Sequence, residues 1–233
     1  GYRWTPIGDG GGATYYYMIP SRCSFWMEGV EIDLSGREND LSVDVIFTNL
    51  QGTRYAWGKA DKMVVTDCII HDITANNNIS VFGNTNRGEM FIANNIIYNI
   101  YSSSTNENHI RVIRDPICSA YVYNNTIYNL ISNTTDLNSY TYAIHSRVDY
   151  PILAKNNYAG NLSAAAGTTA AFYGTFVAGS THNISSDLTG DDGNLANGVT
   201  EADDYSDYFA NVTTGKEDLH LKTTDTVLRN TAT

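Results

Sequence analysis

The segment Phe91-Ile-Ala-Asn-Asn-Ile-Ile-Tyr-Asn-Ile100 decides the fold, because it recurs without gaps along the chain. Full copies are Val64–Ile73, Tyr121–Leu130 and Leu153–Leu162, and weaker copies are Phe47–Leu50 and Asn183–Leu188. The aliphatic residue that ends each copy stands at positions 50, 73, 100, 130, 162 and 188, which gives steps of 23, 27, 30, 32 and 26 residues. A repeat of this length predicts a solenoid in which each copy belongs to one coil.

The residues inside each copy predict which kind of solenoid forms. β-forming residues lead to an Asn-Asn pair, and Ile-Ile-Tyr or its equivalent follows, a pattern typical of strand, tight turn, strand. Asn adopts the left-handed backbone conformation more readily than most residues, so the pair can form a corner. Coils that stack about 4.8 Å apart align equivalent Asn side chains, whose amides can then bond as a ladder. A second polar column precedes the last residue of each copy, at Asn49, Asp72, Asn99, Asn129, Asn161 and Asp187.

These patterns predict an all-β, single-domain parallel β-helix (solenoid) of about six to eight coils with irregular terminal caps. We expect residues 1–40 to form an N-terminal cap or incomplete first coil, residues 41–188 the coils, and residues 189–233 an acidic loop and C-terminal capping segment. Atypical ends are expected because an uncapped coil exposes an open sheet edge. Insertions are expected after the last residue of each copy, where Asn, Ser and Thr are frequent.

Over roughly residues 42–222 the sequence resembles right-handed parallel β-helix proteins of the pectate-lyase-like superfamily. The resemblance rests on the coil motifs at 94–100 and 124–130, and on the tail from Phe209 to Lys222, which is similar to endings found after such helices. It implies a single-stranded, right-handed helix. It implies no activity, because the superfamily includes lyases, hydrolases, adhesins, appendage proteins and phage tailspikes. The Asn-Thr-Asp, Asp-Asp, Gly-His-Gly and Arg-Ile-Lys series of polygalacturonases is absent from the sequence.

Composition restricts the partners. With 14 basic and 25 acidic side chains, the net charge of -11 disfavours nucleic acid and anionic membrane surfaces. No apolar run is long enough to span a membrane. At Gly1 the chain has no charged-then-apolar signal segment, so we expect it to begin after processing or to be part of a longer protein. Abundant Asn, Thr, Ser, Gly and Tyr, with little Lys, favour an extracellular, cell-surface or virion location.

No metal site or other cofactor site is predicted, although calcium remains a candidate. Cys23, Cys68 and Cys118 are odd in number and lack C-x-x-C spacing, which favours small buried residues over a disulfide framework or zinc site. His71 and His182 lie in repeat columns and are expected to form local hydrogen bonds. The acidic stretch Asp187–Asp207 offers oxygen ligands for calcium, but it lacks the spaced acidic loop of an EF-hand, so a solvated tail is favoured.

The best candidate site is one outer face of the solenoid. A further strand is predicted in each coil, at Ile79–Phe82, Ile110–Ile113, Tyr142–Arg147 and Ala171–Gly174. Alternation directs Ile110 and Val112 inward and His109 and Arg111 outward. Stacking should gather His109, Arg111, Arg114, His145, Arg147 and Tyr173 on one face, which Arg54, Tyr55 and Trp57 extend.

Two functions from different classes follow from this face. The first is a noncatalytic adhesin, appendage or virion-fibre module that contacts a glycan or polysaccharide, or that associates with itself or with other surface proteins. Its glycan-binding residues would be Arg54, Tyr55, Trp57, Arg111, Arg114, Arg147 and Tyr173. The alternative is a secreted lyase or glycoside hydrolase that acts on an acidic glycan, with His109, Arg111, His145 and Arg147 as catalytic candidates and Tyr173 as a further base. A third possibility is a solvated surface with ion pairs to Glu107, Asp115 and Asp149.

Overall fold

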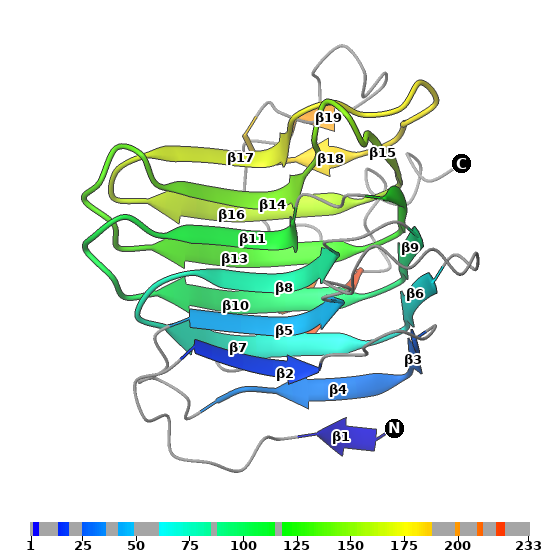
Figure 1. Ribbon diagram of the computed structural model, residues 1–233, viewed down its shortest axis with the longest axis horizontal. Helices are drawn as coiled ribbons and strands as arrows, with labels where there is room; N and C mark the ends of the chain where they lie inside the picture. Colours follow the sequence, from blue (N-terminus) through cyan, green and yellow to red (C-terminus); the bar gives the residue numbers. More distant parts are fainter. Residues whose placement is uncertain are drawn as a thin grey trace, which may run out of the picture.

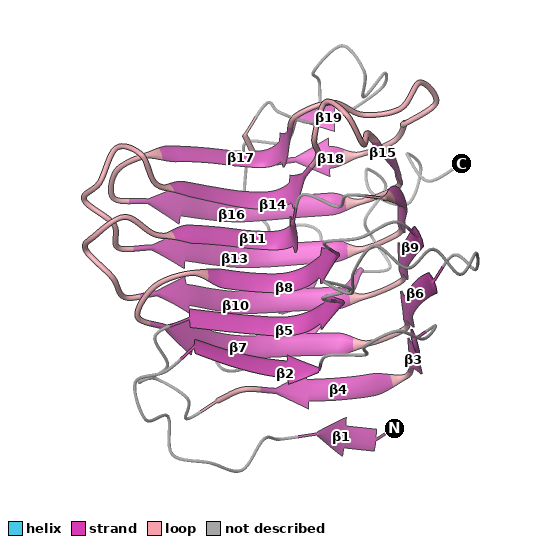
Figure 2. Cartoon of the chain, in the orientation of Figure 1, coloured by secondary structure: helices cyan, strands magenta, loops and turns pink. Residues whose placement is uncertain are grey.

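The structure is a computed structural model. It describes residues 2–4, 14–18, 25–35, 42–48, 61–84, 88–114, 118–187, 199–200, 209–211 and 218–221. These residues form strands and loops without a helix (Figure 2). No helix capable of crossing a membrane is present among them.

Three parallel sheets wind around a common axis (Figure 1). Sheet A contains β1 (Tyr2–Trp4), β4 (Val30–Asp33), β7 (Ile69–Ala75), β10 (Ile96–Ser102), β13 (Thr126–Ser132), β16 (Tyr158–Ala164), β18 (Ile184–Ser185) and β19 (Val199–Thr200). Sheet B contains β2 (Thr14–Met18), β5 (Ser42–Thr48), β8 (Ile79–Asn84), β11 (His109–Arg114), β14 (Tyr140–His145) and β17 (Thr168–Tyr173). Sheet C contains β3 (Phe25–Glu28), β6 (Asp61–Thr66), β9 (Gly88–Ala93), β12 (Ser119–Tyr123) and β15 (Ile152–Lys155).

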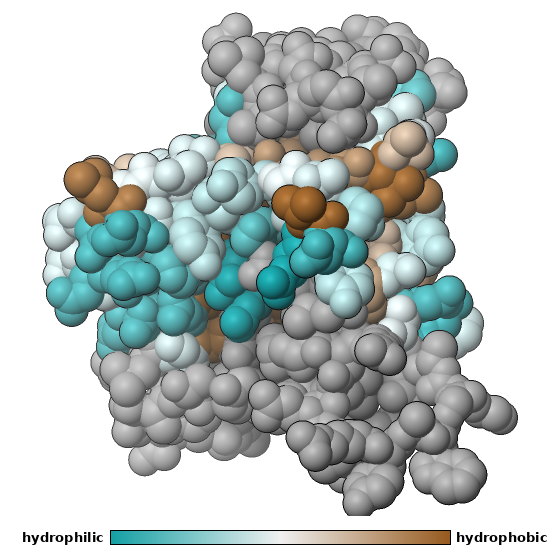
Figure 3. Space-filling view, turned by 45° about the horizontal axis from the view of Figure 1, so that its top comes forward, coloured by the Kyte–Doolittle hydropathy of each residue, from teal (hydrophilic) through white to brown (hydrophobic). Residues whose placement is uncertain are grey.

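Each coil passes through sheets C, A and B in turn, which confirms the predicted parallel β-solenoid. Ile73, Ile100, Leu130 and Leu162 stand in register on neighbouring strands, as the repeat predicted. The solenoid has about four turns, fewer than the six to eight predicted. Loops at 76–78, 103–108, 133–139 and 165–167 join sheet A to sheet B and hold the expected insertions. On the face shown in Figure 3 most of the described residues are hydrophilic, and hydrophobic residues stand among them in a few places.

One weak copy of the repeat was assigned wrongly. Phe47 lies on β5 in sheet B, where it pairs with Gly83, and not in the sheet A column. The strand that precedes β7 in sheet A is β4, in which Ile32 pairs with Ile70. This copy escaped notice because Gly29, with φ of 66°, forms the corner that an Asn or Asp forms in the full copies.

The Asn-Asn corner has the predicted conformation. Its first residue is left-handed in each coil, with φ between 54° and 58° at Asp67, Asn94, Asn124, Asn156 and His182. Its second residue turns inward, and Asn95, Asn125, Asn157 and Asn183 are almost fully buried. We call these four residues the inner ladder.

Each member of the inner ladder bonds its own coil to at least one neighbouring coil, and Asn95, Asn125 and Asn157 each bond to the coils on both sides. Asn125 shows the pattern: its Oδ1 accepts from the backbone N–H of Asn95 at 3.1 Å and from Asn95 Nδ2 at 3.0 Å. Its Nδ2 donates to Ile92 O at 3.0 Å and to Asn157 Oδ1 at 2.9 Å. The side chain therefore replaces backbone hydrogen bonds that the corner breaks, which is necessary because buried polar groups need partners.

The second polar column lies inside the strands of sheet A. Asp72, Asn99, Asn129 and Asn161 also have positive φ, between 54° and 61°. Each Asn side-chain amide in this column donates a hydrogen bond to the side-chain oxygen of the residue one coil nearer the N-terminus. The bonds run from Asn161 to Asn129, from Asn129 to Asn99 and from Asn99 to Asp72. The column thus ends in a carboxylate, which accepts hydrogen bonds and needs to donate none.

Aliphatic side chains fill the solenoid, and Ile70, Ile97, Ile127, Val112 and Ile144 are fully buried. Cys68 and Cys118 are free and buried, as predicted, and Cys23 lies outside the described residues. A second cluster forms on the outer face of sheet A, where Phe209 packs against Tyr128 and Tyr158. Phe209 belongs to an antiparallel pair, β20 (Phe209–Asn211) and β21 (Asp218–Leu221), that covers this part of the sheet.

Candidate functional site

The candidate site lies on the outer face of sheet B. The register pairs His109 with Tyr140, Arg111 with Tyr142, and His145 with Tyr173. In β11, both Val112 and Ile113 face the core, so alternation shifts by one residue. This shift places Arg114 on the same side as Arg111, and equivalent inward pairs in β14 and β17 place His145 and Tyr173 there. We call His109, Arg111, Arg114, Tyr140, Tyr142, His145 and Tyr173 the ring-stack face.

Four rings form a continuous stack across three coils. The ring centroids of His109 and Tyr140 are 3.7 Å apart, those of Tyr140 and Tyr142 are 4.8 Å apart, and those of Tyr142 and Tyr173 are 4.3 Å apart. All three pairs are nearly parallel. His145 stands edge-on to Tyr142 at 5.1 Å and to Tyr173 at 5.3 Å. Tyr140 and Tyr142 were missed as site residues, although alternate tyrosines on a strand beside a His-bearing strand could have indicated them.

The cations of this face lie against the rings. The Arg111 guanidinium carbon lies 5.3 Å from the Tyr140 ring centroid, and Arg111 is only 6% exposed. Arg114 Nη1 is 3.5 Å from Ser80 Oγ, and His109 Nε2 is 3.5 Å from Glu107 Oε1. The described Lys and Arg side chains are Lys62, Arg111, Arg114, Arg147 and Lys155. Three of these five are arginines on β11 or in the loop after β14.

Arg147 lies elsewhere than predicted. Strand β14 ends at His145, and Arg147 is an exposed residue of the following loop, where it forms a β-bridge with Tyr150. The strand ends because the buried Ser146 turns inward and its Oγ accepts from Ile152 N at 3.1 Å. Arg147 is therefore beside the ring-stack face and not on its strands. Arg54, Tyr55, Trp57 and Asp115 lie outside the described residues, as does most of the acidic stretch after Asp187.

Burial changes the acidity of two groups. Burial, and then the positive charge of Arg111, lowers the pKa of His109, although Glu107 acts in the opposite direction. Burial, and then Tyr173, raises the pKa of Tyr142 far above that of an ordinary tyrosine. At neutral pH His109 is therefore an uncharged imidazole and Tyr142 a protonated phenol.

The stack decides which ring surfaces a ligand can reach. Tyr140 and Tyr142 each have a neighbouring ring on both faces, so they offer mainly edges to a ligand. Tyr173 is the last ring of the stack, belongs to the end strand of sheet B, and is 45% exposed. The site therefore has one open aromatic ring at the end of a rigid stack.

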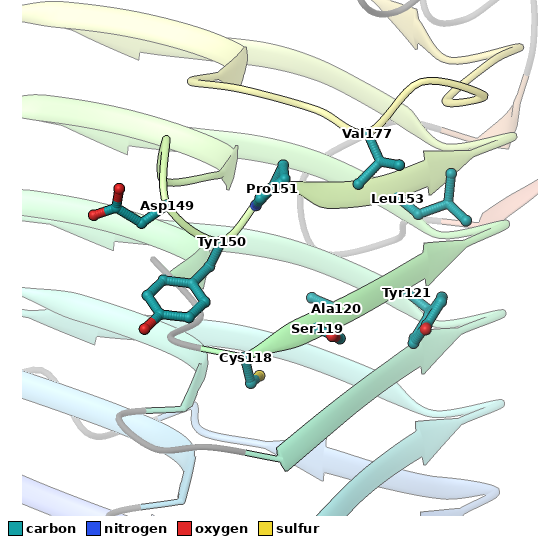
Figure 4. A pocket seen from close by; sticks show the side chains of 9 residues that line it. All are labelled: Cys118, Ser119, Ala120, Tyr121, Asp149, Tyr150, Pro151, Leu153 and Val177. Atoms are coloured by element: carbon teal, nitrogen blue, oxygen red, sulfur yellow. The ribbon is translucent and has the colours of Figure 1, made fainter.

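A separate pocket of about 420 Å³ lies on the outside of sheet C (Figure 4). Its walls include Cys118, Tyr121, Tyr150, Leu153 and Val177. Asp149 lies at its rim, and its carboxylate points away from Tyr121 and Leu153 on the opposite wall. None of the residues of the ring-stack face lines this pocket, so the two surfaces are distinct.

His71 and His182 form local hydrogen bonds, as predicted. His71 Nδ1 lies 2.8 Å from Asp72 Oδ2, and His182 Nδ1 lies 2.8 Å from Thr181 Oγ1. His71 also stacks on Tyr98, with ring centroids 5.0 Å apart.

The chain matches no protein family model, no curated protein and no solved structure in comparisons with known proteins.

Proposed function

We propose that the protein is a noncatalytic extracellular or surface module, of the adhesin, appendage or virion-fibre type, whose ring-stack face contacts a glycan. We also propose that it belongs to the pectate-lyase-like superfamily of right-handed parallel β-helices, as the coil motifs suggest. The observation that carries the functional proposal is the exposed ring of Tyr173 at the end of the stack.

Tyr173 has the properties of a platform for a sugar ring. Tyr142 covers one of its faces, and His145 abuts it edge-on, so the ring is held in place while 45% of the residue stays accessible. A fixed aromatic ring loses little conformational entropy when a ligand covers it. Arg114 and the exposed Arg147 supply guanidinium groups that pair with carboxylate or sulfate substituents.

The burial of Arg111 favours a contact surface over an active site. A lyase needs a base and a charge neutraliser within about 3 Å of one substrate atom. Arg111 is 6% exposed and lies against Tyr140, so its guanidinium has little surface left for a substrate carboxylate. Tyr142 keeps its proton at neutral pH because its pKa is raised, so it cannot serve as the base.

One observation favours a lyase as the second candidate. His109 has a lowered pKa and is therefore unprotonated at neutral pH, as a general base must be. It lies two residues from Arg111 on the same outward side of β11. A polysaccharide lyase acting on an acidic glycan would use His109 as the base and Arg114 as the neutraliser, because the guanidinium of Arg111 is covered.

Glycan-array binding followed by calorimetry tests the proposal. Tyr173→Ala should weaken binding of the selected glycan about 5–30-fold, since stacking on an aromatic ring contributes on the order of 1–2 kcal/mol. Tyr150→Ala is the matched control, because Tyr150 is similarly exposed at 37% but lies at the pocket on sheet C. Equal affinities of the two variants, or an array without any bound glycan, would refute the proposal.

Incubation of the protein with acidic glycans separates the two candidates. A lyase forms a carbon–carbon double bond next to the cleaved linkage, which is detected by ultraviolet absorbance. Product that appears with the wild type and is lost in His109→Gln would establish the enzyme and remove the noncatalytic proposal.

A further inference from the structure

The first full copy of the repeat departs from the others at two adjacent positions on the outer face of sheet A. His71 stands where Tyr98 and Tyr128 stand in the next coils, and Asp72 stands where Asn99 and Asn129 stand. The fold requires neither change, since Tyr and Asn fill the same positions in the coils above. Both substituted residues have side chains that bind metals.

Strand β4 contributes a third ligand-type side chain from the coil below. Asp33 pairs in register with His71 and is 3% exposed, while His71 is 6% exposed. Three potential ligand atoms, one each from Asp33, His71 and Asp72, lie within 4.8 Å of one another. In a zinc site each of these atoms would lie about 2.0–2.2 Å from the ion, so the side chains would rotate toward it on binding.

Each of the three side chains is oriented by a partner outside the trio. Ser35 N–H donates to Asp33 Oδ1 at 2.9 Å, and Asn99 Nδ2 donates to Asp72 Oδ1 at 3.0 Å. His71 Nε2 lies 3.1 Å from Glu31 Oε1. A ligating imidazole typically donates its second N–H to a carboxylate, and ligating carboxylates are themselves hydrogen-bonded. The cluster therefore has the outer contacts of a metal site as well as its ligand types.

We propose that Asp33, His71 and Asp72 bind one divalent transition-metal ion, with Zn²⁺ as the first candidate. In this arrangement His71 Nε2–H donates to Glu31, and the Nδ1 lone pair faces the ion. Asp72 Oδ2 lies 2.8 Å from His71 Nδ1. Without metal these two atoms share a proton in a hydrogen bond, and the bound ion would replace that proton. Sequence alone predicted no metal site, because Asp33 lies 38 positions before His71 and β4 had not been recognised as part of the same sheet.

One imidazole and two carboxylates select among metals by their chemistry. An imidazole suits zinc, and carboxylates alone suit calcium or magnesium. Ca²⁺ takes six to eight oxygen ligands, which one imidazole and two carboxylates do not supply. Zn²⁺ needs four ligands, so the trio plus one water completes its shell. The ion would tie β4 to β7 and so join two successive coils.

The test uses the whole chain, freed of metal with a chelator and titrated with ZnCl₂ by calorimetry. We expect one Zn²⁺ per chain, and a higher midpoint of thermal unfolding when the ion is bound. CaCl₂ should bind much more weakly. His71→Tyr and Asp72→Asn, which restore the residues of the next coil, should each abolish the tight binding while the far-ultraviolet circular dichroism stays unchanged.

Further variants keep the test decisive if His71→Tyr fails to fold. Glu31→Gln changes a partially exposed outer partner and should weaken Zn²⁺ binding about 10–100-fold. His182→Asn is the matched control, because it also restores the repeat residue at a His position but lies outside the cluster; its Zn²⁺ affinity should equal that of the wild type. Absence of Zn²⁺ binding by the chelator-treated wild type at millimolar ZnCl₂, or wild-type affinity in folded Asp72→Asn, would overturn the proposal.

Discussion

Replacement of Asn125 by alanine tests the inner ladder, on which the stacking of the coils depends. The side chain is 1% exposed and takes part in four hydrogen bonds that link three successive coils. Alanine fits the space and leaves the neighbouring left-handed residue, Asn124, unchanged. The substitution therefore removes the hydrogen bonds with little change in the conformation of the corner.

The expected loss of stability follows from the partners that remain. The backbone N–H of Asn95 loses its acceptor in a buried position, whereas Asn95 Nδ2 keeps Val65 O at 3.0 Å and Asn157 Oδ1 keeps Asn125 N at 3.0 Å. One orphaned buried donor costs about 1–3 kcal/mol, and each of the other three lost bonds costs about 0.5–1.5 kcal/mol. The free energy of unfolding should therefore fall by roughly 2.5–7.5 kcal/mol. This is a large part of the 5–15 kcal/mol that is typical of a folded domain.

Urea unfolding followed by circular dichroism measures this loss. Asn138→Ala is the control, since Asn138 is an exposed loop residue, and its effect should stay within about 0.5 kcal/mol. If Asn125→Ala changes the free energy of unfolding by no more than the control, the ladder does not stabilise the fold and the reasoning fails.

Three other predictions address the turns, the ring-stack face and the C-terminal strand pair. Gly174 and Gly179 both have a φ of 99°, but a Cβ at Gly174 would lie 1.9 Å from Ser146 O, whereas a Cβ at Gly179 would meet no atom within 4 Å. Gly174→Ala should therefore lower the urea midpoint of unfolding clearly more than Gly179→Ala does. Equal shifts would contradict the packing of this turn. Because the pKa of His109 is lowered in the folded protein, the contribution of neutral His109 to stability is complete above its ordinary pKa of 6.5 and is lost as the pH falls below that value. The free energy of unfolding, measured between pH 8 and pH 5, should thus decline less in His109→Phe than in the wild type. Parallel curves of stability against pH would speak against a neutral His109. Phe209 is 1% exposed and packs against Tyr128 and Tyr158. Phe209→Ala should therefore lower the free energy of unfolding by about 3–5 kcal/mol and speed proteolysis after residue 200. An unchanged proteolysis rate would show that this contact does not hold the strand pair.

The sequence determined the architecture because a solenoid repeats the same local problem in every coil. Each coil must turn sharply at one corner and fill an apolar interior, so the same residue types recur at Asn94, Asn124 and Asn156. For the same reason an aliphatic residue recurs in each copy of the repeat, from Ile73 to Leu162, and these residues stand in register in sheet A. Where the corner used glycine at Gly29, this signal disappeared and the copy was missed.

Tertiary structure alone decided some of the contacts between coils. Loop lengths differ from coil to coil, so residues that stack, such as Tyr142 and Tyr173, lie at separations that no period predicts. The inward pair Val112 and Ile113 breaks simple alternation, and this break determines that Arg114 joins the ring-stack face. Asp33 meets His71 only because β4 pairs with β7. A local pattern fixes the conformation of each coil, but contacts between coils depend on the register of the sheets.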